Sequence, residues 1–245
     1  MTPKGQLLAS DNLKSHGIEG LIVCGGDGTF NGAMKLSQYG IRVIGIPCTI
    51  DNDMAYTEFT IGFDTAINTV INAVGNIRDT SSSHERTSVV EVMGRDCGDI
   101  AIYSGMACGA DSILIPEIPV DLDLICKNIY AGVKRGKSHT IIIKAEGVDI
   151  SSETLAEVIE EKTHQEVRST VLAHIQRGGS PSARDRVLAS EMGHRAVQLL
   201  MTGRTNLAVG INGAQIIDVP LEEAVTYRSD VQDFRMLSLI EILAR

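Results

Sequence analysis

The stretch IEGLIVCGGDGT, residues 18–29, points to the fold class of the whole chain. Its first part, residues 18–24, is a short apolar run rich in branched side chains, which predicts a buried strand. The glycine-rich turn at residues 25–29 follows directly, and we expect a helix to start from it. A strand that leads through such a turn into a helix is typical of α/β proteins, whose ligands bind at the carboxyl ends of the strands.

The same alternation continues along the chain. Further strands are expected at residues 42–46, 88–93, 112–115, 140–145, 170–175 and 207–211, and helices at 64–80, 99–108, 122–134, 151–162 and 182–201. Most of these strands are apolar almost throughout, as is typical of parallel sheets with helices on both faces. The pattern therefore predicts an α/β fold with mostly parallel sheets.

Composition narrows the function classes. The chain has 245 residues, a formal net charge of −9, 4% aromatic residues and no tryptophan, which argues against nonspecific nucleic-acid binding and against a base-stacking platform. No apolar run approaches the ~20 residues of a membrane helix, and the first residues carry no secretory apolar region. Five cysteines without a CxxC pair fit reduced thiols better than a zinc site. We expect a cytoplasmic protein with no nucleic-acid and no membrane partner.

The glycine turn is a candidate phosphate site. Glycines let backbone N–H groups approach phosphate oxygens, and the helix start adds positive potential. Asp27 would repel a phosphate by itself, but it fits such a site if it holds Mg²⁺ that bridges to the phosphates. The alternative interpretation is an ordinary strand-to-helix turn capped by an aspartate.

A second polar segment, TIDND at residues 49–53, follows the strand at 42–46. One of its carboxylates can accept a proton from an attacking hydroxyl, while the other supports a metal or orients its neighbours. A turn rich in Asp and Asn is the alternative, because both residues favour turns. If the two strands are neighbours in a parallel sheet, Asp27 and Asp51 lie on the same rim, one at a magnesium ion and the other at a substrate hydroxyl.

Positive side chains gather near other expected strand ends. They are Arg86, Arg95, Arg168, His174 and Arg177, several of them beside glycines. An acidic protein that binds phosphates must concentrate its few cations, and the planar fork of arginine suits bidentate phosphate binding. Glu146, at another strand end, would accept hydrogen bonds from sugar hydroxyls. Taken singly, an arginine is usually a solvated surface residue, a histidine is usually structural, and Glu146 would be an ordinary loop acid.

In this order the motifs resemble those of bacterial-type 6-phosphofructokinases. The segments that carry the resemblance are GGDGT at residues 25–29, PCTIDND at 47–53, MGR at 93–95 and HIQRGGSP at 174–181. The glycine turn is shared with NAD kinases and lipid kinases, whereas TIDND and HIQRGGSP separate this sequence from them. The similarity extends over residues 10–215.

The resemblance implies transfer of the γ-phosphoryl group of MgATP to the 1-hydroxyl of fructose 6-phosphate, a step of glycolysis. By matching position, the catalytic residues are Asp51, Thr49 and Arg95, the ATP-binding residues are Gly26, Asp27, Gly28 and Thr29, and Asp27 also serves Mg²⁺. The substrate-binding residues are Thr49, Ile50, Asp51, Arg86, Met93, Gly94, Arg95, Glu146, Arg168, His174, Ile175, Gln176 and Arg177. A separate nucleotide effector site matches Arg78, Gly109, Asp111, Arg135, Lys137 and His139.

The resemblance also implies an architecture and an assembly. We expect two Rossmann-like three-layer α/β/α domains, a nucleotide-binding domain at 1–62 plus 175–225 and a sugar-phosphate-binding domain at 63–174 plus 226–245. Arg86 and Arg168 would reach the substrate phosphate of a neighbouring subunit, which implies a homo-oligomer, typically a tetramer.

Two alternatives stay open from the sequence. The chain begins after the first strand and glycine turn of the family pattern, so a fragment without activity, or a regulatory subunit that binds sugar phosphate or nucleotide, is one alternative. A pyrophosphate-dependent enzyme is the other. Gly28 favours ATP, because pyrophosphate users carry Asp there, whereas Cys48 matches neither the lysine of that class nor the glycine usual in ATP users.

Overall fold

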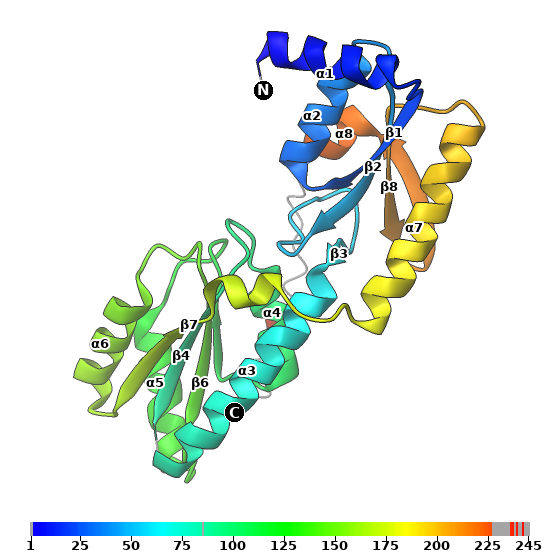
Figure 1. Cartoon of the computed structure of the whole chain (residues 1–245). Helices are drawn as coiled ribbons and strands as arrows, with labels where there is room; N and C mark the ends of the chain where they lie inside the picture. The colour runs from blue at the N-terminus through cyan, green and yellow to red at the C-terminus, as the bar shows by residue number, and fades with distance from the viewer. Residues whose placement is uncertain (1, 85, 227–235, 238, 240–241, 243–245) are drawn as a thin grey trace. The chain divides into compact units, whose positions relative to one another are not determined.

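A computed structural model describes residues 2–84, 86–226, 236–237, 239 and 242. The chain forms two compact units (Figure 1). Of the described residues, the first unit contains those up to Phe63 and those from Pro181 to Thr226, and the second contains Asp64–Ser180 and those after 231. The chain thus leaves the first unit one residue after the expected boundary and returns to it six residues after the expected one. Most of 226–245, expected in the second domain, lies outside the described residues.

The sheet of the first unit contains β1 (Gly20–Gly25), β2 (Arg42–Thr49), β8 (Leu207–Asn212) and β9 (Gln215–Pro220) in that order, and the short β3 (Ile61–Gly62) pairs with the end of β2. Strands β1, β2, β3 and β8 run parallel, and β9 returns antiparallel. The helices of this unit are α1 (Pro3–Ser15), α2 (Asp27–Ser37), α7 (Ala183–Met201) and α8 (Leu221–Thr226).

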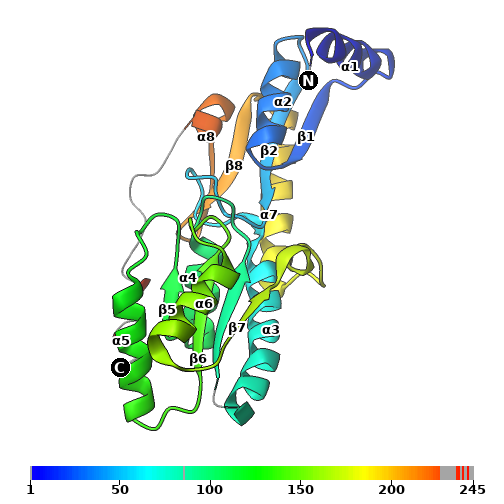
Figure 2. The same cartoon turned by 90° about the vertical axis from the view of Figure 1, so that its left-hand side faces the viewer.

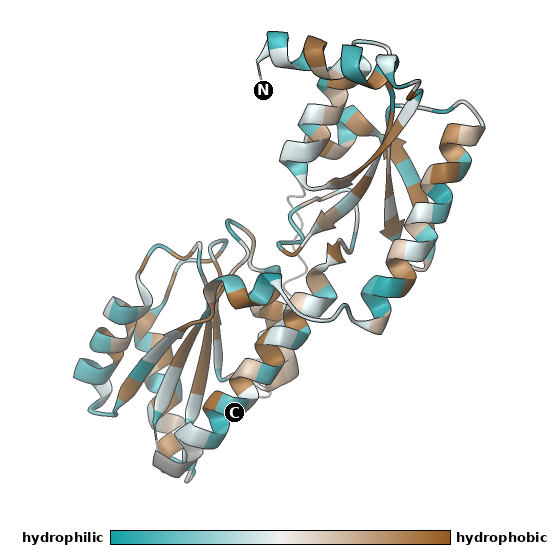
Figure 3. Cartoon of the chain, viewed as in Figure 1, coloured by the Kyte–Doolittle hydropathy of each residue, from teal (hydrophilic) through white to brown (hydrophobic). Residues whose placement is uncertain are grey.

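Neighbouring residues of β2 are buried on opposite faces of this sheet. Val43 packs with Phe30 of α2 and Leu221 of α8, whereas Ile44 packs with Met192 of α7. Successive side chains of a strand point to opposite faces, so helices cover the sheet on both sides. In Figure 3 the strands of this sheet are mostly brown, whereas the helices beside them carry bands of teal, white and brown. The first unit is therefore a three-layer α/β/α domain.

The second unit has a parallel sheet of β5 (Ser112–Leu114), β6 (Thr140–Ala145), β4 (Thr87–Val92) and β7 (Val167–Val171), in that order. Its helices are α3 (Phe63–His84), α4 (Asp99–Cys108), α5 (Leu122–Lys134), α6 (Ser152–Thr163) and the 3₁₀ helix η1 (Ala173–Arg177). Val89 and Val90 are adjacent in β4 and both are fully buried, so this sheet too is covered on both faces. Figure 2 shows α6 in front of the sheet.

These sheets confirm the expected α/β class with mostly parallel strands. The strand expected at 170–175 is wrong in its bounds: β7 ends at Val171, and residues 173–177 form η1. Ala173 has a φ of 46°, which an extended strand cannot contain. The antiparallel β9 was not expected; it follows a two-residue turn with Gly213 at a φ of 61°. No helix among the described residues is long and apolar enough to cross a membrane.

Candidate functional site

The carboxyl edge of the first sheet brings the two acidic motifs side by side. Strands β1 and β2 pair in register up to Gly25 and Pro47, so the GGDGT turn and the TIDND segment leave the sheet next to each other. A Cβ atom built on Gly26 would lie 3.7 Å from the Cβ of Thr49. The expectation that Asp27 and Asp51 follow neighbouring strand ends on one rim is therefore met by the register of the sheet.

The start of α2 is shaped for an anion. Gly26 is the N-cap residue and has no side-chain cap, and Asp27 opens the first turn. The N–H groups of a first helical turn have no partner within the helix and carry partial positive charge. A Cβ atom on Gly28 would meet nothing within 4 Å, so the space above this turn is open. Phosphate oxygens fit this helix start.

Packing fixes how α2 is seated on the sheet. The ring of Phe30 is fully buried against Gly45 of β2, and a Cβ atom on that glycine would lie 2.6 Å from the ring. The N–H groups of Thr29 and Phe30 both donate to the carbonyl oxygen of Gly26, which closes the first turn. The glycine turn is thereby held in one conformation by the helix that follows it.

The TIDND segment is held by a network of short hydrogen bonds. Asn52 has a φ of 54°, and its side-chain Oδ1 accepts the N–H of Thr60 at 2.9 Å. The hydroxyl of Thr60 donates to the carbonyl oxygen of Thr49 at 2.7 Å, and the N–H of Asp51 donates to Oγ1 of Thr49 at 3.2 Å. Asp51 is 2% exposed. Hydrogen bonds that involve Thr49 and Thr60 therefore fix the backbone on either side of Asp51.

A buried carboxylate of α7 anchors the neighbouring strand. Oδ1 of Asp185 accepts the N–H of Gly62 at 3.0 Å, and Asp185 is 3% exposed. Gly62 pairs with Thr49 across β3 and β2. The hydroxyl of Ser182 caps α7 by accepting the N–H of Asp185. The start of α7 is thus tied to the strand beside the TIDND segment.

Cys48 precedes this segment as a neutral thiol. Burial, followed by the neighbouring Cys24, raises the pKa of Cys48 to about 12. A thiol with that pKa carries no charge near neutral pH. The position therefore offers a small uncharged side chain.

The acidic residues of this edge suit a magnesium ion that is shared with a ligand. Among the described residues no three His, Cys, Asp or Glu side chains gather into a metal cluster. Mg²⁺ commonly binds through one or two carboxylates and takes its other ligands from water and substrate phosphates. Asp27, at a helix start open to phosphates, matches that donor set.

The carboxyl edge of the second sheet brings together five expected substrate residues. Oε1 of Glu146 accepts the N–H of Gly94 at 3.2 Å and the N–H of Arg95 at 2.9 Å. Oε1 of Gln176 accepts the N–H of Met93 at 3.1 Å, and its Nε2 donates to the carbonyl oxygen of Ala173. The turn that follows β4 is therefore held between Glu146, which follows β6, and the buried amide of Gln176 in η1.

Backbone conformation and close packing also hold Arg95. Gly94 has a φ of 135° and Arg95 a φ of 54°, both in the left-handed region that only glycine adopts readily. A Cβ atom on Gly147 would overlap the carbonyl oxygen of Arg95. The side chain of Arg95 is exposed at this edge. Of the remaining expected residues, His174, Ile175 and Arg177 lie exposed on η1.

Arg86 and Arg168 lie at the opposite, amino edge of the same sheet. Arg86 precedes β4, and Arg168 is the second residue of β7. Glu166 bridges them, with Oε2 at 2.8 Å from Nε of Arg86 and Oε1 at 2.6 Å from Nη2 of Arg168. The hydrogen bond from Arg86 lowers the pKa of Glu166, with Arg168 adding to the effect. The structure does not bring these two arginines to Arg95 and Glu146 within one chain.

The expected effector residues also gather at this amino edge. A guanidinium N–H of Arg78 in α3 donates to the carbonyl oxygen of Cys108, directly before Gly109. Lys137 forms an ion pair with Asp111, whose other oxygen accepts the N–H of Ile141 at 2.9 Å. Arg135 caps the end of α5. Partial burial, and then Arg78, lower the pKa of His139.

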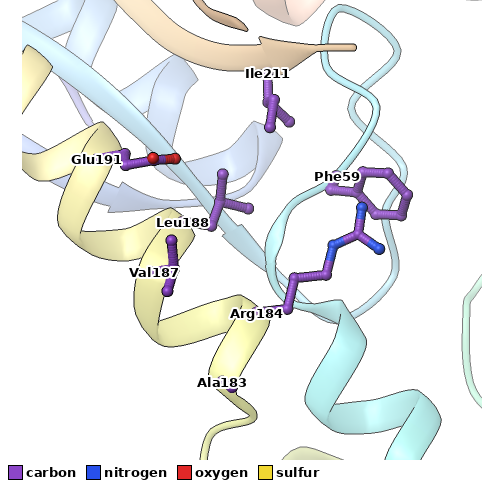
Figure 4. A pocket seen from close by; sticks show the side chains of 7 residues that line it. All are labelled: Phe59, Ala183, Arg184, Val187, Leu188, Glu191 and Ile211. Carbon is purple, nitrogen blue, oxygen red and sulfur yellow. The ribbon is translucent and has the colours of Figure 1, made fainter. Parts of the chain in front are cut away.

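A separate pocket of about 360 Å³ lies in the first unit (Figure 4). Its lining is mostly apolar, from Leu188 and Val187 of α7 to Ile211 of β8. The guanidinium carbon of Arg184 lies 3.6 Å from the ring centroid of Phe59 at its rim. It contains none of the residues expected from the motifs.

Sequence reasoning missed the residues that hold the site in place. Thr60, Asp185 and Gly147 were not expected to take part. The position of Asp185 three residues after Ser182 indicates a helix start, but no local signal predicts its bond to Gly62, 123 residues away. Gly147 could have been found from the sequence, because it directly follows the motif residue Glu146.

The two mostly parallel sheets and their helix and strand order define a known class of α/β fold. A phosphofructokinase structure from Saccharomyces cerevisiae matches with a TM-score of 0.84 and 33% identity, over 91% of this chain and 34% of that chain. This chain therefore spans about a third of that yeast protein. A pyrophosphate-dependent phosphofructokinase from Marinobacter aquaeolei matches with a TM-score of 0.82 and 23% identity, over 93% of this chain and 65% of that chain, which supports the fold alone.

Sequence comparisons give the family. The family model of phosphofructokinase matches residues 1–200. An ATP-dependent 6-phosphofructokinase from Clostridium tetani is 56% identical over 225 residues, which cover 92% of this chain and 70% of the relative. A relative from Clostridium botulinum with the same description is 55% identical over 224 residues, covering 91% of this chain and 70% of the relative. The chain belongs to the phosphofructokinase family.

Proposed function

We propose that this chain transfers the γ-phosphoryl group of MgATP to the 1-hydroxyl of fructose 6-phosphate. The observation that carries the proposal is the placement of Asp51, a nearly buried carboxylate on a fixed backbone, beside a helix start open to phosphates. Phosphoryl transfer needs positioned phosphates, a proton acceptor and compensation of the phosphate charge. At this edge the start of α2 would position the phosphates and compensate part of their charge, and Asp51 would accept the proton. The relatives that carry the reaction in their names add support.

The first unit would hold the nucleotide phosphates and activate the sugar hydroxyl. Backbone N–H groups of Gly26, Asp27 and Gly28 would donate to phosphate oxygens, and Thr29, whose own N–H closes the turn on Gly26, would contact the phosphates beside them. Asp27 would hold Mg²⁺, which when bound neutralises negative charge on the phosphates. Asp51 would accept the proton from the attacking hydroxyl oxygen, and Thr49 and Ile50 would line its approach.

The second unit would hold the sugar phosphate and stabilise the transferred group. Arg95, presented outward by its left-handed backbone, would compensate the charge on the transferred phosphoryl oxygens. Glu146 uses Oε1 for backbone N–H groups, so its other oxygen would accept a sugar hydroxyl beside Met93 and Gly94. His174, Ile175 and Arg177 on η1 would contact the substrate at its 6-phosphate end, while Gln176 holds η1 in place.

Arg86 and Arg168 would act on the site of another subunit. Between Arg86 and Met93 lie the six residues of β4, about 20 Å at ~3.3 Å each. A guanidinium reaches a phosphate only in direct contact, so these arginines cannot serve the phosphate site of their own chain. This separation favours a homo-oligomer, a tetramer by family resemblance, in which Arg86, half-buried, and Arg168, exposed, would exchange Glu166 for the substrate phosphate of a neighbour. The amino-edge cluster around Arg78, Asp111 and Lys137 would be a regulatory nucleotide site.

The second candidate function is transfer from pyrophosphate. Two positions favour ATP over pyrophosphate. The space at Gly28 is open, with no carboxylate that would repel a nucleotide, and position 48 holds a neutral thiol in place of the lysine expected of a pyrophosphate user. The assay is fructose 1,6-bisphosphate formation with ATP or with pyrophosphate. We expect turnover with ATP, and turnover with pyrophosphate alone would assign the chain to the other class.

Replacing Asp51 by Asn tests the base itself. The amide has the same shape and cannot accept the proton, so kcat should fall about 10²- to 10⁴-fold while fructose 6-phosphate still binds. Equal turnover by both forms would remove Asp51 from the chemistry. Calorimetry separates the regulatory-subunit alternative, which predicts binding of fructose 6-phosphate or ADP by the unaltered chain without any turnover.

A further inference from the structure

A lysine is buried in the centre of the second sheet. Lys144 of β6 is 1% exposed, although its ammonium group carries a charge. Its Nζ donates to Oε2 of Glu91 at 3.0 Å and to the carbonyl oxygen of Ala145 at 3.3 Å. Burial of a charged side chain is costly unless it is paired and hydrogen-bonded, so this position is held by specific contacts.

Glu91 is the centre of this arrangement. It lies opposite Lys144 in the register of β4 and β6, and its Oε2 also accepts the hydroxyl of Ser152 at 2.5 Å. Ser152 is 1% exposed and begins α6. The carbonyl oxygen of Glu91 accepts the N–H of Leu172, directly before η1. One residue therefore links β4 to β6, to α6 and to the segment that enters η1.

Three members of this arrangement, Glu91, Lys144 and Leu172, each lie two residues before a residue assigned to substrate. Glu146 follows Lys144 by two positions and Met93 follows Glu91 by two. The N–H of Glu146 donates to the carbonyl oxygen of Val92 at 2.8 Å, so the strand register continues up to the substrate residues. A shift of β6 against β4 would therefore move Glu146 relative to the N–H groups of Gly94 and Arg95.

We propose that Lys144 is a positioning residue that acts through Glu91, fixing the ends of β4 and β6 so that Glu146 and Arg95 meet the sugar phosphate in one geometry. The proposal rests on the proposed function. Hydrogen bonds between these two charged groups are directional, whereas apolar side chains at the same places would pack without fixing a register. Misplacement of a binding group by about 1 Å is enough to cost a large part of catalysis.

The test starts with Lys144→Met, which keeps the length of the side chain and removes its charge. We expect kcat/KM for fructose 6-phosphate to fall about 10-fold or more, with the KM for ATP changed less than about twofold. Amide hydrogen exchange in residues 93–98 should become faster. The matched control is Lys162→Met, which removes a surface ion pair with Asp123 in the same unit, at side chains 45% and 87% exposed. The control should leave both measurements unchanged.

The double variant Lys144→Met/Glu91→Leu separates positioning from stability. It buries no unpaired carboxylate, so it should fold and regain thermal stability even where Lys144→Met alone does not. We expect kcat/KM for fructose 6-phosphate to stay low and exchange at 93–98 to stay fast. Recovery of both to the values of the unaltered chain would overturn the proposal, since the pair would then serve stability only. If the unaltered chain shows no turnover, the proposed function fails, while the exchange comparison still tests the positioning.

Discussion

Gly147 packs directly against the carbonyl oxygen of Arg95, with no room for a methyl group between them. This contact joins the turn after β6 to the turn after β4. Gly147→Ala should therefore displace Arg95, and we expect kcat/KM to fall about 10²-fold, because a misplacement of about 1 Å suffices for such a loss. Steady-state kinetics with both substrates measures it.

The control for this substitution is Gly75→Ala in α3, where a Cβ atom meets nothing within 4 Å. It should raise the free energy of unfolding by about 0.4–1 kcal/mol, because alanine restricts the unfolded chain. Its kinetics should match those of the unaltered protein. Unchanged kinetics in Gly147→Ala would show that Arg95 tolerates the shift.

Gly28 allows a test of donor recognition without loss of the fold. A side chain at this position points into open space, so both Gly28→Ala and Gly28→Asp should fold. The carboxylate would stand among the phosphates of the nucleotide and repel them. We expect the KM for ATP to rise at least about 10-fold for Gly28→Asp, about 1.4 kcal/mol of lost binding, and to change little for Gly28→Ala. Equal effects of the two substitutions would point to backbone strain as their cause.

Asp185 should matter for the TIDND segment although it lies on another element. Asp185→Ala leaves the N–H of Gly62 without its acceptor, and a buried donor without a partner costs about 1–3 kcal/mol of stability. Asp185→Asn keeps an acceptor oxygen at the same place and should restore most of the loss. Urea unfolding of the three forms measures the difference. If Asn destabilises as much as Ala, the negative charge of Asp185 matters more than its hydrogen bond.

If the amino-edge cluster binds a nucleotide as proposed, His139 gives that binding a pH dependence. Burial and Arg78 lower its pKa, so the ring is neutral at pH 7 without ligand. A phosphate bound beside it would raise that pKa, and binding would take up a proton. The affinity for ADP should then increase as the pH falls from the raised pKa of His139 in the complex to its lowered pKa in the free protein, and His139→Gln should remove this dependence. Calorimetry in buffers of different ionisation enthalpy counts the protons, and a count of zero contradicts the prediction.

The sequence was sufficient to predict the elements that bear the chemistry. Short apolar runs rich in branched side chains predicted β1 and β2, and the register of these strands then placed Asp27 and Asp51 on one edge. Residues of β4 and β6 were found in the same way, because strands buried on both faces give an unmistakable run.

Long-range contacts account for what the sequence did not predict. The β7 strand ends at Val171 although residues 172–175 continue the apolar pattern, because Gln176 turns inward to bond Met93 and Ala173 takes a positive φ. Apolar periodicity cannot register a side chain that satisfies a distant N–H group. The bond between Asp185 and Gly62 escaped prediction for the same reason.

The contact between Phe30 and Gly45 determines how close the start of α2 lies to the sheet. Because Gly45 carries no side chain, the ring of Phe30 packs directly on β2 and brings α2 close to the sheet. A larger residue at position 45 would push α2 away from the sheet and displace the backbone of Asp27 and Gly28. The absence of a side chain on Gly45 thus sets how far the start of α2, the proposed phosphate site, stands from the sheet.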